Sequence, residues 1–352
     1  MRGKLTWILA LSLASAPIAS GQVAPVPEAR NVLTRYLDWA DIHPSVGAGQ
    51  LTVFPITLSR SVEGLGSVTT MQQALDRGLL VIEELPSAQV SSARFINKSK
   101  DTMIFLMAGE LITGGKQNRT LRSDALLGAS SSTVLPLYCV QKGRWKGGGK
   151  FDGTSAVVPQ AVREKAAGSA GQDAIWSEVR RANKRLRSST ASEDLYAAMA
   201  KPENARQLAV WRKKVHPHLP RGCVGVVVAY GSRIVGADLF NSPELFSAMR
   251  DKVLDSYLSQ YGWPVAVHRK RPIPVRPVTA EAVRAYLRDC YRTRFVAGEL
   301  QGVGRVYYLR GVRGGQTLGY NERAMVHTAL MSPAVLPVRP RPRPIPMPGP
   351  RR

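Results

Sequence analysis

The chain is poor in the residues that build metal centres and disulfide frameworks. Its 352 residues include three cysteines and five histidines. Cys139, Cys223 and Cys290 show no Cys-x-x-Cys spacing and make no disulfide framework, although one bridge with one free thiol stays open. The close pair His216 and His218 has no neighbouring glutamate, and a structural zinc site needs four ligands. We therefore expect no metal site.

Motifs that indicate a cofactor or a catalytic nucleophile are also missing. The sequence holds no Gly-x-Ser-x-Gly elbow and no Walker loop, and Gly302-Val-Gly304 lacks the third glycine of a dinucleotide fingerprint. No repeat with a period of about 20 to 50 residues is present. The sequence thus predicts no cofactor, and it identifies no reaction.

Long apolar runs are absent except at the N-terminus. Arg2 and Lys4 precede the apolar run 5–16, and the small residues 19–21 follow it, which is the order of a secretory signal peptide. The run is shorter than the roughly 20 residues that span a bilayer. We predict a signal peptide over residues 1–21, export to the periplasm or the medium, and no integral membrane span in the mature chain. An uncleaved anchor helix is the alternative.

Acidic residues are scarce. The chain has 25 Asp and Glu against 49 Lys and Arg, a formal net charge of +24. With the two cations of the signal peptide and the five arginines of the C-terminal tail set aside, the body keeps +17. Such a field attracts polyanions, among them nucleic acid, acidic lipid and cell-envelope polymer. A general bias toward arginine without a specific partner is the alternative.

The remaining residues predict one β-rich α+β domain with mixed or antiparallel strands and several helices. We place it at residues 49–332, because strands and helices recur there without regular β-α-β alternation. Residues 22–48 form an N-terminal segment without a strong pattern. From Pro337 the tail (333–352) holds seven prolines and five arginines, which predicts a disordered, polyproline-like arm. Nothing in the sequence indicates an oligomeric state.

Local patterns place individual elements within this domain. A capping box at Thr69–Gln72 predicts a short helix. Strands at 90–96 and 102–108 are joined by a polar link, which predicts a hairpin, as does the turn at Gly231-Ser232 between 223–230 and 233–237. Further strands are predicted at 51–58, 79–82, 133–140, 303–309 and 326–330, and helices at 172–187, 241–261 and 280–288.

The segment 108–119 is the first candidate for a functional site. An apolar strand ends at Glu110, and Gly114-Gly115 then lets the backbone turn tightly or approach a ligand. Four polar residues follow at once, of which the cations can hold a phosphate or carboxylate and the amides can read a ligand edge. They are Lys116, Gln117, Asn118 and Arg119. The alternative is a polar loop whose Arg119 pairs with Glu110.

Two further candidates follow later strands. In the segment 139–145, Arg144 offers an anion contact and Trp145 a stacking face for a base or sugar. The alternative is a tryptophan that covers the core edge with an arginine stacked on it. Asp238 follows the strand 233–237, where a carboxylate can serve a ligand, a turn or a helix cap.

These segments together resemble the ARG and rhodanese-phosphatase-superfamily-associated domain family, a bacterial and archaeal group of unknown function. The resemblance covers about residues 45–262, extending toward 330, and its combination of motifs is specific. The motifs are Gly109-Glu110 with Gly114–Arg119, Cys139–Trp145, Gln172-x-x-Ile-Trp176-x-x-Val179, Gly236–Phe240 with Ser242-Pro-x-Leu-Phe246, and Leu254-x-Ser-Tyr257.

The resemblance implies a single β-rich α+β domain in which the first two segments lie near one site. It implies no established reaction. The family pattern has an acidic residue between the Cys-Val and Gly-Arg-Trp elements, where this chain has Gln141. If that acid is a catalytic base in the family, its absence here favours a binding role.

Three functions remain open from the sequence. The leading hypothesis is an exported protein that binds an anionic small molecule or polyanion through Lys116, Arg119 and Arg144, with Gln117, Asn118 and Trp145 reading it. The second is a hydrolase or transferase on a phosphate- or ribose-containing substrate, with Glu110 as general acid or base. The third is a structural envelope protein tethered by its basic tail.

Overall fold

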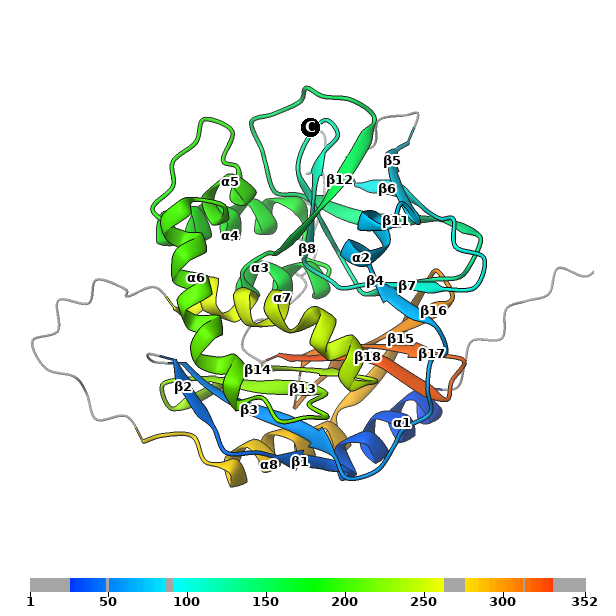
Figure 1. The fold of residues 1–352 in the computed structure, drawn as a ribbon, viewed down its shortest axis with the longest axis vertical. Coiled ribbons are helices and arrows are strands. Elements are labelled where there is room, and N and C mark those ends of the chain that lie inside the picture. The colour runs from blue at the N-terminus through cyan, green and yellow to red at the C-terminus, as the bar shows by residue number, and fades with distance from the viewer. Residues whose placement is uncertain (1–25, 49–50, 86–90, 263–275, 313, 332–352) are drawn as a thin grey trace, which may run out of the picture.

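The computed structural model describes residues 26–48, 51–85, 91–262, 276–312 and 314–331. The segments predicted as signal peptide and C-terminal arm lie outside these ranges. The described chain forms an α+β fold with antiparallel and mixed sheets, which confirms the predicted fold class (Figure 1). No helix in these ranges combines the length and the apolar character needed to traverse a bilayer.

A nine-stranded antiparallel sheet forms the lower layer in Figure 1. Its strand order is β1-β3-β13-β14-β18-β17-β16-β15, and β2 pairs with β3 outside this order. The strands are β1 (Ala40–Ile42), β2 (Val46–Ala48), β3 (Leu51–Leu58), β13 (Gly225–Tyr230), β14 (Arg233–Phe240), β15 (Arg294–Gln301), β16 (Gly304–Arg310), β17 (Gly314–Tyr320) and β18 (Ala324–Met331).

A closed barrel forms the upper layer, with the order β11-β6-β5-β12-β8-β9. Its strands are β5 (Leu80–Glu84), β6 (Ser92–Asn97), β8 (Glu110–Gly114), β9 (Arg119–Leu121), β11 (Ser131–Cys139) and β12 (Lys150–Val157). A small sheet joins the barrel to the layer below, with β4 (Val68–Thr70) parallel to β7 (Met103–Leu106) and β10 (Ala125–Leu127) antiparallel to it.

Helices cover both faces of the large sheet. α1 (Val26–Asp38) and α8 (Ala280–Arg288) share a core with one face, and α7 (Pro243–Tyr261) shares a core with the other. The remaining helices pack beside α7 and the barrel: α2 (Met71–Asp76), α3 (Gln160–Ala167), α4 (Gln172–Arg185), α5 (Leu195–Met199) and α6 (Pro202–Val215), with short 3-10 turns at His216–His218 and Asp289–Arg292.

Strand β13 shows why the centre of the sheet reads as an unbroken apolar run. Successive side chains of a strand point to opposite faces. Val226 and Val228 join the core under α7, whereas Val227 and Ala229 join the core under α1 and α8. Both faces are buried, so no polar position interrupts the run.

The three cysteines are buried and carry free thiols.

The barrel is inserted between two neighbouring strands of the sheet. β3 and β13 pair with Ile56 opposite Gly225, although β4 to β12 and α2 to α6 lie between them in the sequence. We call residues 59–224 the inserted segment and the other described residues the frame. The chain therefore leaves and re-enters the frame at adjacent points.

Elements with a strong local pattern lie where the sequence predicts them. Strand β3 occupies 51–58, and the hairpin of β13 and β14 turns at Gly231-Ser232. Helix α4 buries Ile175, Val179 and Ala182 on one face. The hydroxyl of Ser242 accepts a hydrogen bond from the backbone N–H of Leu245 and caps α7.

Some local predictions were wrong. Asp238 lies inside β14 rather than after a strand, and Glu110 begins β8 rather than ending an apolar strand. β6 and β7 do not form a hairpin: β6 pairs with β5 and β11, while β7 pairs with β4 and β10. The side chain of Asn97 donates to the carbonyls of Thr102 and Gly128, both at 2.8 Å, and so turns the chain from the barrel into the small sheet. The capping box lies one residue later, at Thr70 and Gln73.

Candidate functional site

Two loops meet at the upper end of the barrel, and Arg144 joins them. The guanidinium donates to the carbonyls of Gly114 and Gly115, each at 3.0 Å, and to Asn118 Oδ1 at 3.1 Å. Its other N–H groups donate to Gln141 Oε1 and to the carbonyl of Lys146, both at 2.7 Å. The segments 114–119 and 139–146 are therefore adjacent, and all five donors of Arg144 hold them together.

The amides of the two loops are also engaged with the protein. Asn118 Nδ2 donates to both carboxylate oxygens of Asp194, at 3.1 and 3.2 Å, and Gln141 Nε2 donates to Asp194 Oδ2 at 3.0 Å. Asp194 in turn caps α5 by accepting from Tyr196 N at 2.9 Å. Gln117 donates to the carbonyl of Lys142 at 3.5 Å. Asn118 and Gln141 thus fix the loops onto α5, and Gln117 joins one loop to the other.

Arg119 is buried and pairs with Glu84, not with Glu110. Its Nη2 lies 2.9 Å from Glu84 Oε1, its Nη1 donates to the carbonyl of Ser92 at 3.2 Å, and its Cζ lies 4.9 Å from the centroid of the Phe151 ring. Burial lowers the pKa of Arg119, and the charge of Glu84 only partly offsets this. Arg119 is therefore buried within the barrel and presents no surface to a ligand.

The double glycine is required by the turn between β8 and β9. Gly114 and Gly115 have φ angles of +84° and +50°, and a Cβ on Gly115 would lie 2.3 Å from Cε1 of Phe151. The tight turn that the sequence predicts here is confirmed. It brings the backbone N–H of Lys116 to 2.8 Å from Glu84 Oε1.

On the outer side of the loops, two lysines each lie over the ring of a tryptophan. Lys116 Nζ lies 5.2 Å from the centroid of the Trp145 ring, and Lys142 Nζ lies 5.0 Å from that of Trp176 in α4. Trp145 is 47% exposed, and Lys146 beside it is also exposed. We call Lys116, Lys142, Trp145, Lys146 and Trp176 the paired-loop surface.

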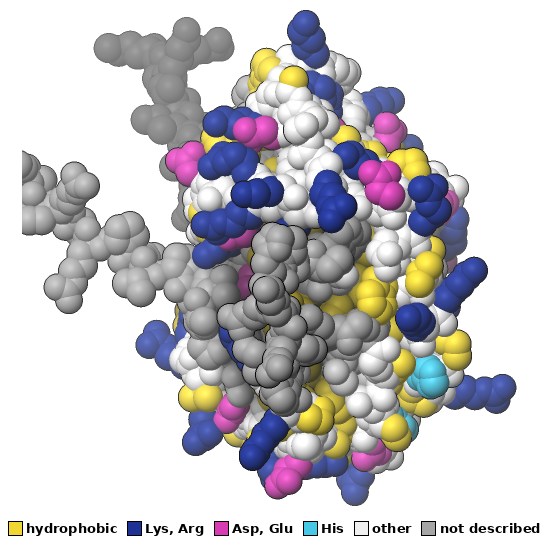
Figure 2. Space-filling model, turned by 90° about the vertical axis from the view of Figure 1, so that its left-hand side faces the viewer, with side chains coloured by type: hydrophobic (Ala, Val, Ile, Leu, Met, Phe, Trp, Pro, Cys, Tyr) yellow, Lys and Arg dark blue, Asp and Glu magenta, His cyan; other side chains and the backbone are white. Residues whose placement is uncertain are grey.

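Helix α4 continues the positive charge from Trp176. Its exposed cations are Arg180, Arg181, Lys184 and, just beyond its end, Arg187. Figure 2 shows Lys and Arg side chains gathered in the upper half of the face that carries α4 and α5. Two of these cations have acidic partners, since Arg180 lies 3.9 Å from Glu193 and Arg181 forms an ion pair with Glu178, and the row as a whole keeps a net positive charge.

Glu110 and Asp238, the other two residues selected from the sequence, lie elsewhere. Strand β8 separates Glu110 from the glycine turn by its five residues, about 13 Å. Glu110 accepts a hydrogen bond from the backbone N–H of Met107 at 2.7 Å and forms an ion pair with Lys252 of α7. It is closed to solvent, with no exposed surface.

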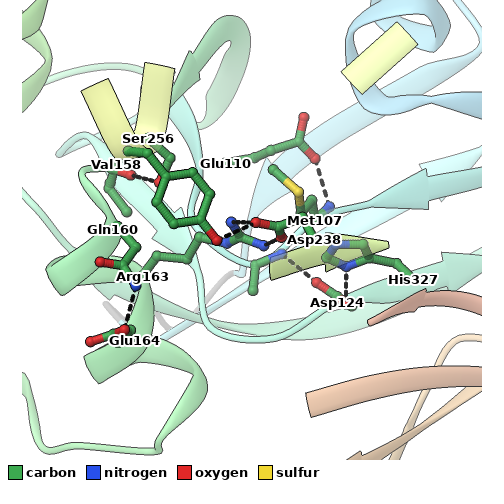
Figure 3. A network of polar contacts seen from close by, with 12 residues as sticks. Met107, Glu110, Asp124, Val158, Gln160, Arg163, Glu164, Asp238, Ser256 and His327 are labelled. Carbon is green, nitrogen blue, oxygen red and sulfur yellow. Dashed lines mark hydrogen bonds and ion pairs between the residues drawn. The ribbon is translucent and has the colours of Figure 1, made fainter. Parts of the chain in front are cut away.

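Asp238 belongs to the same buried region and makes three contacts (Figure 3). It pairs with Arg163 of α3, accepts from the hydroxyl of Tyr257 at 2.8 Å, and lies 3.0 Å from His327 Nε2. The other imidazole nitrogen of His327 lies 2.7 Å from Asp124. Because both nitrogens face carboxylates, His327 donates twice and carries a proton on each nitrogen.

We call Glu110, Asp124, Arg163, Asp238, Lys252 and His327 the buried charged cluster. Its members form four ion pairs. Three of them join the inserted segment to the frame: Glu110 with Lys252, Asp124 with His327, and Arg163 with Asp238. The fourth, Asp238 with His327, lies within the frame. The six side chains are at most 6% exposed, so the cluster connects the barrel to the sheet and presents nothing to a ligand.

The ionisation states of the cluster follow from these contacts. Burial works to raise the pKa of Asp238, but the Arg163 guanidinium and His327 outweigh it, and the pKa lies well below its ordinary value. Burial works to lower the pKa of His327, but Asp124 and then Asp238 outweigh it, and the pKa is raised. At nearby Glu164 burial outweighs the charge of Arg163 and the hydrogen bond from Gln160, and it raises the pKa to about 8.

Sequence analysis missed Asp124, Arg163, Lys252 and His327. A lone histidine in the apolar run 326–330 was the available signal for this cluster. Its partners are distant in the sequence and share no motif spacing. The glycine at position 109 is explained by the proximity of Arg163. The φ of Gly109 is +88°, and a Cβ there would lie 2.9 Å from Arg163 Cγ.

The fold and these contacts define a β-rich α+β protein in which a barrel with two fixed loops is locked onto a large sheet by buried charges. The chain matches the ARG and Rhodanese-Phosphatase-superfamily-associated Protein domain over residues 40–331, and it belongs to that family. Comparison with curated proteins found no match, and neither did comparison with solved structures. Within the described residues, no three His, Cys, Asp or Glu side chains group as metal ligands.

Proposed function

We propose that this protein binds an anionic ligand, of phosphate, nucleotide or polymer type, on the paired-loop surface and the adjoining face of α4. One observation carries the proposal: two ammonium groups stand over tryptophan rings, 5.2 and 5.0 Å from the centroids, on loops whose amides and guanidiniums are engaged within the protein. Lys116 and Trp145 keep the contact role expected from the sequence. Gln117, Asn118, Arg119 and Arg144 become the support that fixes them.

The physical advantage of this arrangement is preorganisation. A loop held by Arg144 and Asp194 loses little conformational freedom on binding, so less of the interaction energy is spent on ordering it. Exposed lysines attract phosphate or carboxylate groups, and a tryptophan face accepts a base or sugar ring. The surrounding excess of 49 Lys and Arg over 25 Asp and Glu adds long-range attraction.

Charge reversal on the loop tests the proposal. In a Lys142→Glu, Lys146→Glu variant, affinity for inorganic polyphosphate and for a single-stranded oligonucleotide should fall by about tenfold or more at low salt, and the salt dependence should weaken by about one counterion per lost contact. Tryptophan fluorescence titrations at two salt concentrations measure both.

The matched control is Lys98→Glu, Lys100→Glu, which makes the same change of net charge at the exposed link between β6 and β7. Affinity for both probes should stay close to that of the unaltered protein. An equal loss in the two double variants would show that only overall charge matters, and unmeasurable binding by the unaltered protein would refute the proposal.

The competing functions find less support. Glu110 has no exposed surface and is neutralised by Lys252, so a substrate cannot reach it as a general acid or base in this conformation. The tether function depends on residues 333–352, which lie outside the described ranges.

We further propose that the protein is exported, on the evidence of residues 1–21. When the full-length gene is expressed in a bacterium, intact-mass analysis of the purified protein should show loss of about twenty N-terminal residues. An Arg2→Glu, Lys4→Glu variant should accumulate unprocessed. Recovery of the unaltered protein with its N-terminus intact would contradict export by cleavage.

A further inference from the structure

A hollow lies at the opposite end of the molecule from the paired-loop surface. It has a volume of about 300 Å³ and is bounded by α1, by the 61–63 loop and by the turn between β17 and β18. In Figure 1, α1 and these strands lie in the lower half, whereas the two loops lie at the top. The volume is at the lower end of the range for small-molecule pockets.

The walls of this hollow combine apolar and polar surface and are held in place. Val32, Trp39, Val62 and Met325 contribute apolar surface. Asn241 fixes two of the walls, because its Nδ2 donates to the carbonyl of Glu63 at 3.0 Å and to the carbonyl of Met325 at 2.9 Å. The pocket is thus formed before any ligand enters.

Four charged side chains surround the hollow, two of each sign: Arg35, Glu63, Glu322 and Arg323. All four residues are exposed, and within the described part of the chain none of them takes part in an ion pair. This distinguishes the hollow from the buried charged cluster, where every charge has a partner. Unpaired charges of both signs beside an apolar floor remain available to a ligand.

The balance of charge selects the chemical class of the ligand. An anion would meet Glu63 and Glu322, and a cation would meet Arg35 and Arg323. A neutral apolar molecule would leave the charges of both signs without a partner. A ligand with one carboxylate, one ammonium and an apolar body satisfies both signs. We infer that this pocket binds a small zwitterion, namely an apolar amino acid or a short peptide.

The inference is tested by blocking one charge of the ligand at a time. Calorimetry on the full chain should show saturable binding of leucine, phenylalanine or leucyl-leucine. N-acetyl-leucine, without the ammonium, and leucinamide, without the carboxylate, should each bind about tenfold or more weakly, because each leaves charged groups of the pocket unpaired. Equal binding of leucine and N-acetyl-leucine would overturn the inference, as would absence of saturable binding for all three zwitterions.

Paired variants assign the two signs to the protein. Glu63→Gln, Glu322→Gln should remove the preference for leucine over N-acetyl-leucine, and Arg35→Gln, Arg323→Gln should remove the preference over leucinamide. Glu203→Gln, Arg206→Gln neutralises one charge of each sign on the exposed face of α6, away from the hollow, and should keep both preferences. If the two pocket variants keep both preferences, the zwitterion binds elsewhere and the assignment fails. Polyphosphate binding at the paired-loop surface should be unaffected, so the two proposals stand or fall separately.

Discussion

Asp238→Asn should lower the free energy of unfolding by about 3 to 5 kcal/mol, the usual cost of removing one partner from a buried ion pair. The carboxylate faces Arg163, His327 and the hydroxyl of Tyr257 at once, and it has no exposed surface. An amide leaves the Arg163 guanidinium without its counter-charge and removes one of the two carboxylates that face the His327 imidazolium. Urea unfolding followed by circular dichroism measures the difference.

The pH dependence supplies an internal check on the same residue. The pKa of Asp238 is lower in the folded chain than its ordinary value of about 3.9. Its stabilisation is therefore present above that pH and is lost as the pH falls toward the folded value. The unaltered protein should lose more stability than Asp238→Asn on acidification below about pH 4.

Asp41→Asn on the exposed edge strand β1 is the matched control, and it should change the free energy of unfolding by less than about 0.5 kcal/mol. A similarly small effect of Asp238→Asn at neutral pH would mean that the buried charged cluster contributes no net stability.

Lys252→Met should cost about as much, 3 to 5 kcal/mol, because it leaves the Glu110 carboxylate charged and buried. The double variant Glu110→Gln, Lys252→Met should recover most of this loss. Its glutamine oxygen can still accept from the N–H of Met107, which Glu110 satisfies now at 2.7 Å. A double-mutant cycle from urea unfolding gives the coupling between the two residues.

The cycle separates ion pairing from packing. If the two single losses simply add in the double variant, the residues act independently and the ion pair is not the cause. Ser259→Ala, at another buried polar position of α7, is a reference whose loss should reflect one ordinary hydrogen bond, about 1 kcal/mol.

The sequence revealed elements whose determinants are local. Helix α7 begins with a serine cap and a proline and carries an apolar face, all within its own residues. The glycine turn was likewise predictable, because a pair of adjacent glycines favours the positive φ angles that Gly114 and Gly115 adopt. Helix α1 lacked such signals, and its burial depends on contacts with the far end of the sheet through Leu33, Tyr36 and Leu37.

Partners set by tertiary structure could not be derived in the same way. The sequence suggested that Arg119 pairs with Glu110 because they are neighbours, yet a strand of fixed length separates them and each finds a partner from another element. The loops were expected to converge, and they do. In the structure the guanidiniums of Arg119 and Arg144 bind groups within the protein, and lysines are the outermost cations of the loops. This outcome depends on loop conformations that residue order does not determine.

The inserted segment and the frame look separable along the chain, since the chain leaves and returns at adjacent strands. The buried charged cluster shows that the two parts depend on each other. The inserted segment contributes two acids and one base to the cluster, and the frame contributes one acid and two bases. Split apart, each half would keep an odd, opposite charge in its apolar interior. The two halves are thus complementary fragments of one folding unit, and cutting at the shared strands would yield no autonomous module.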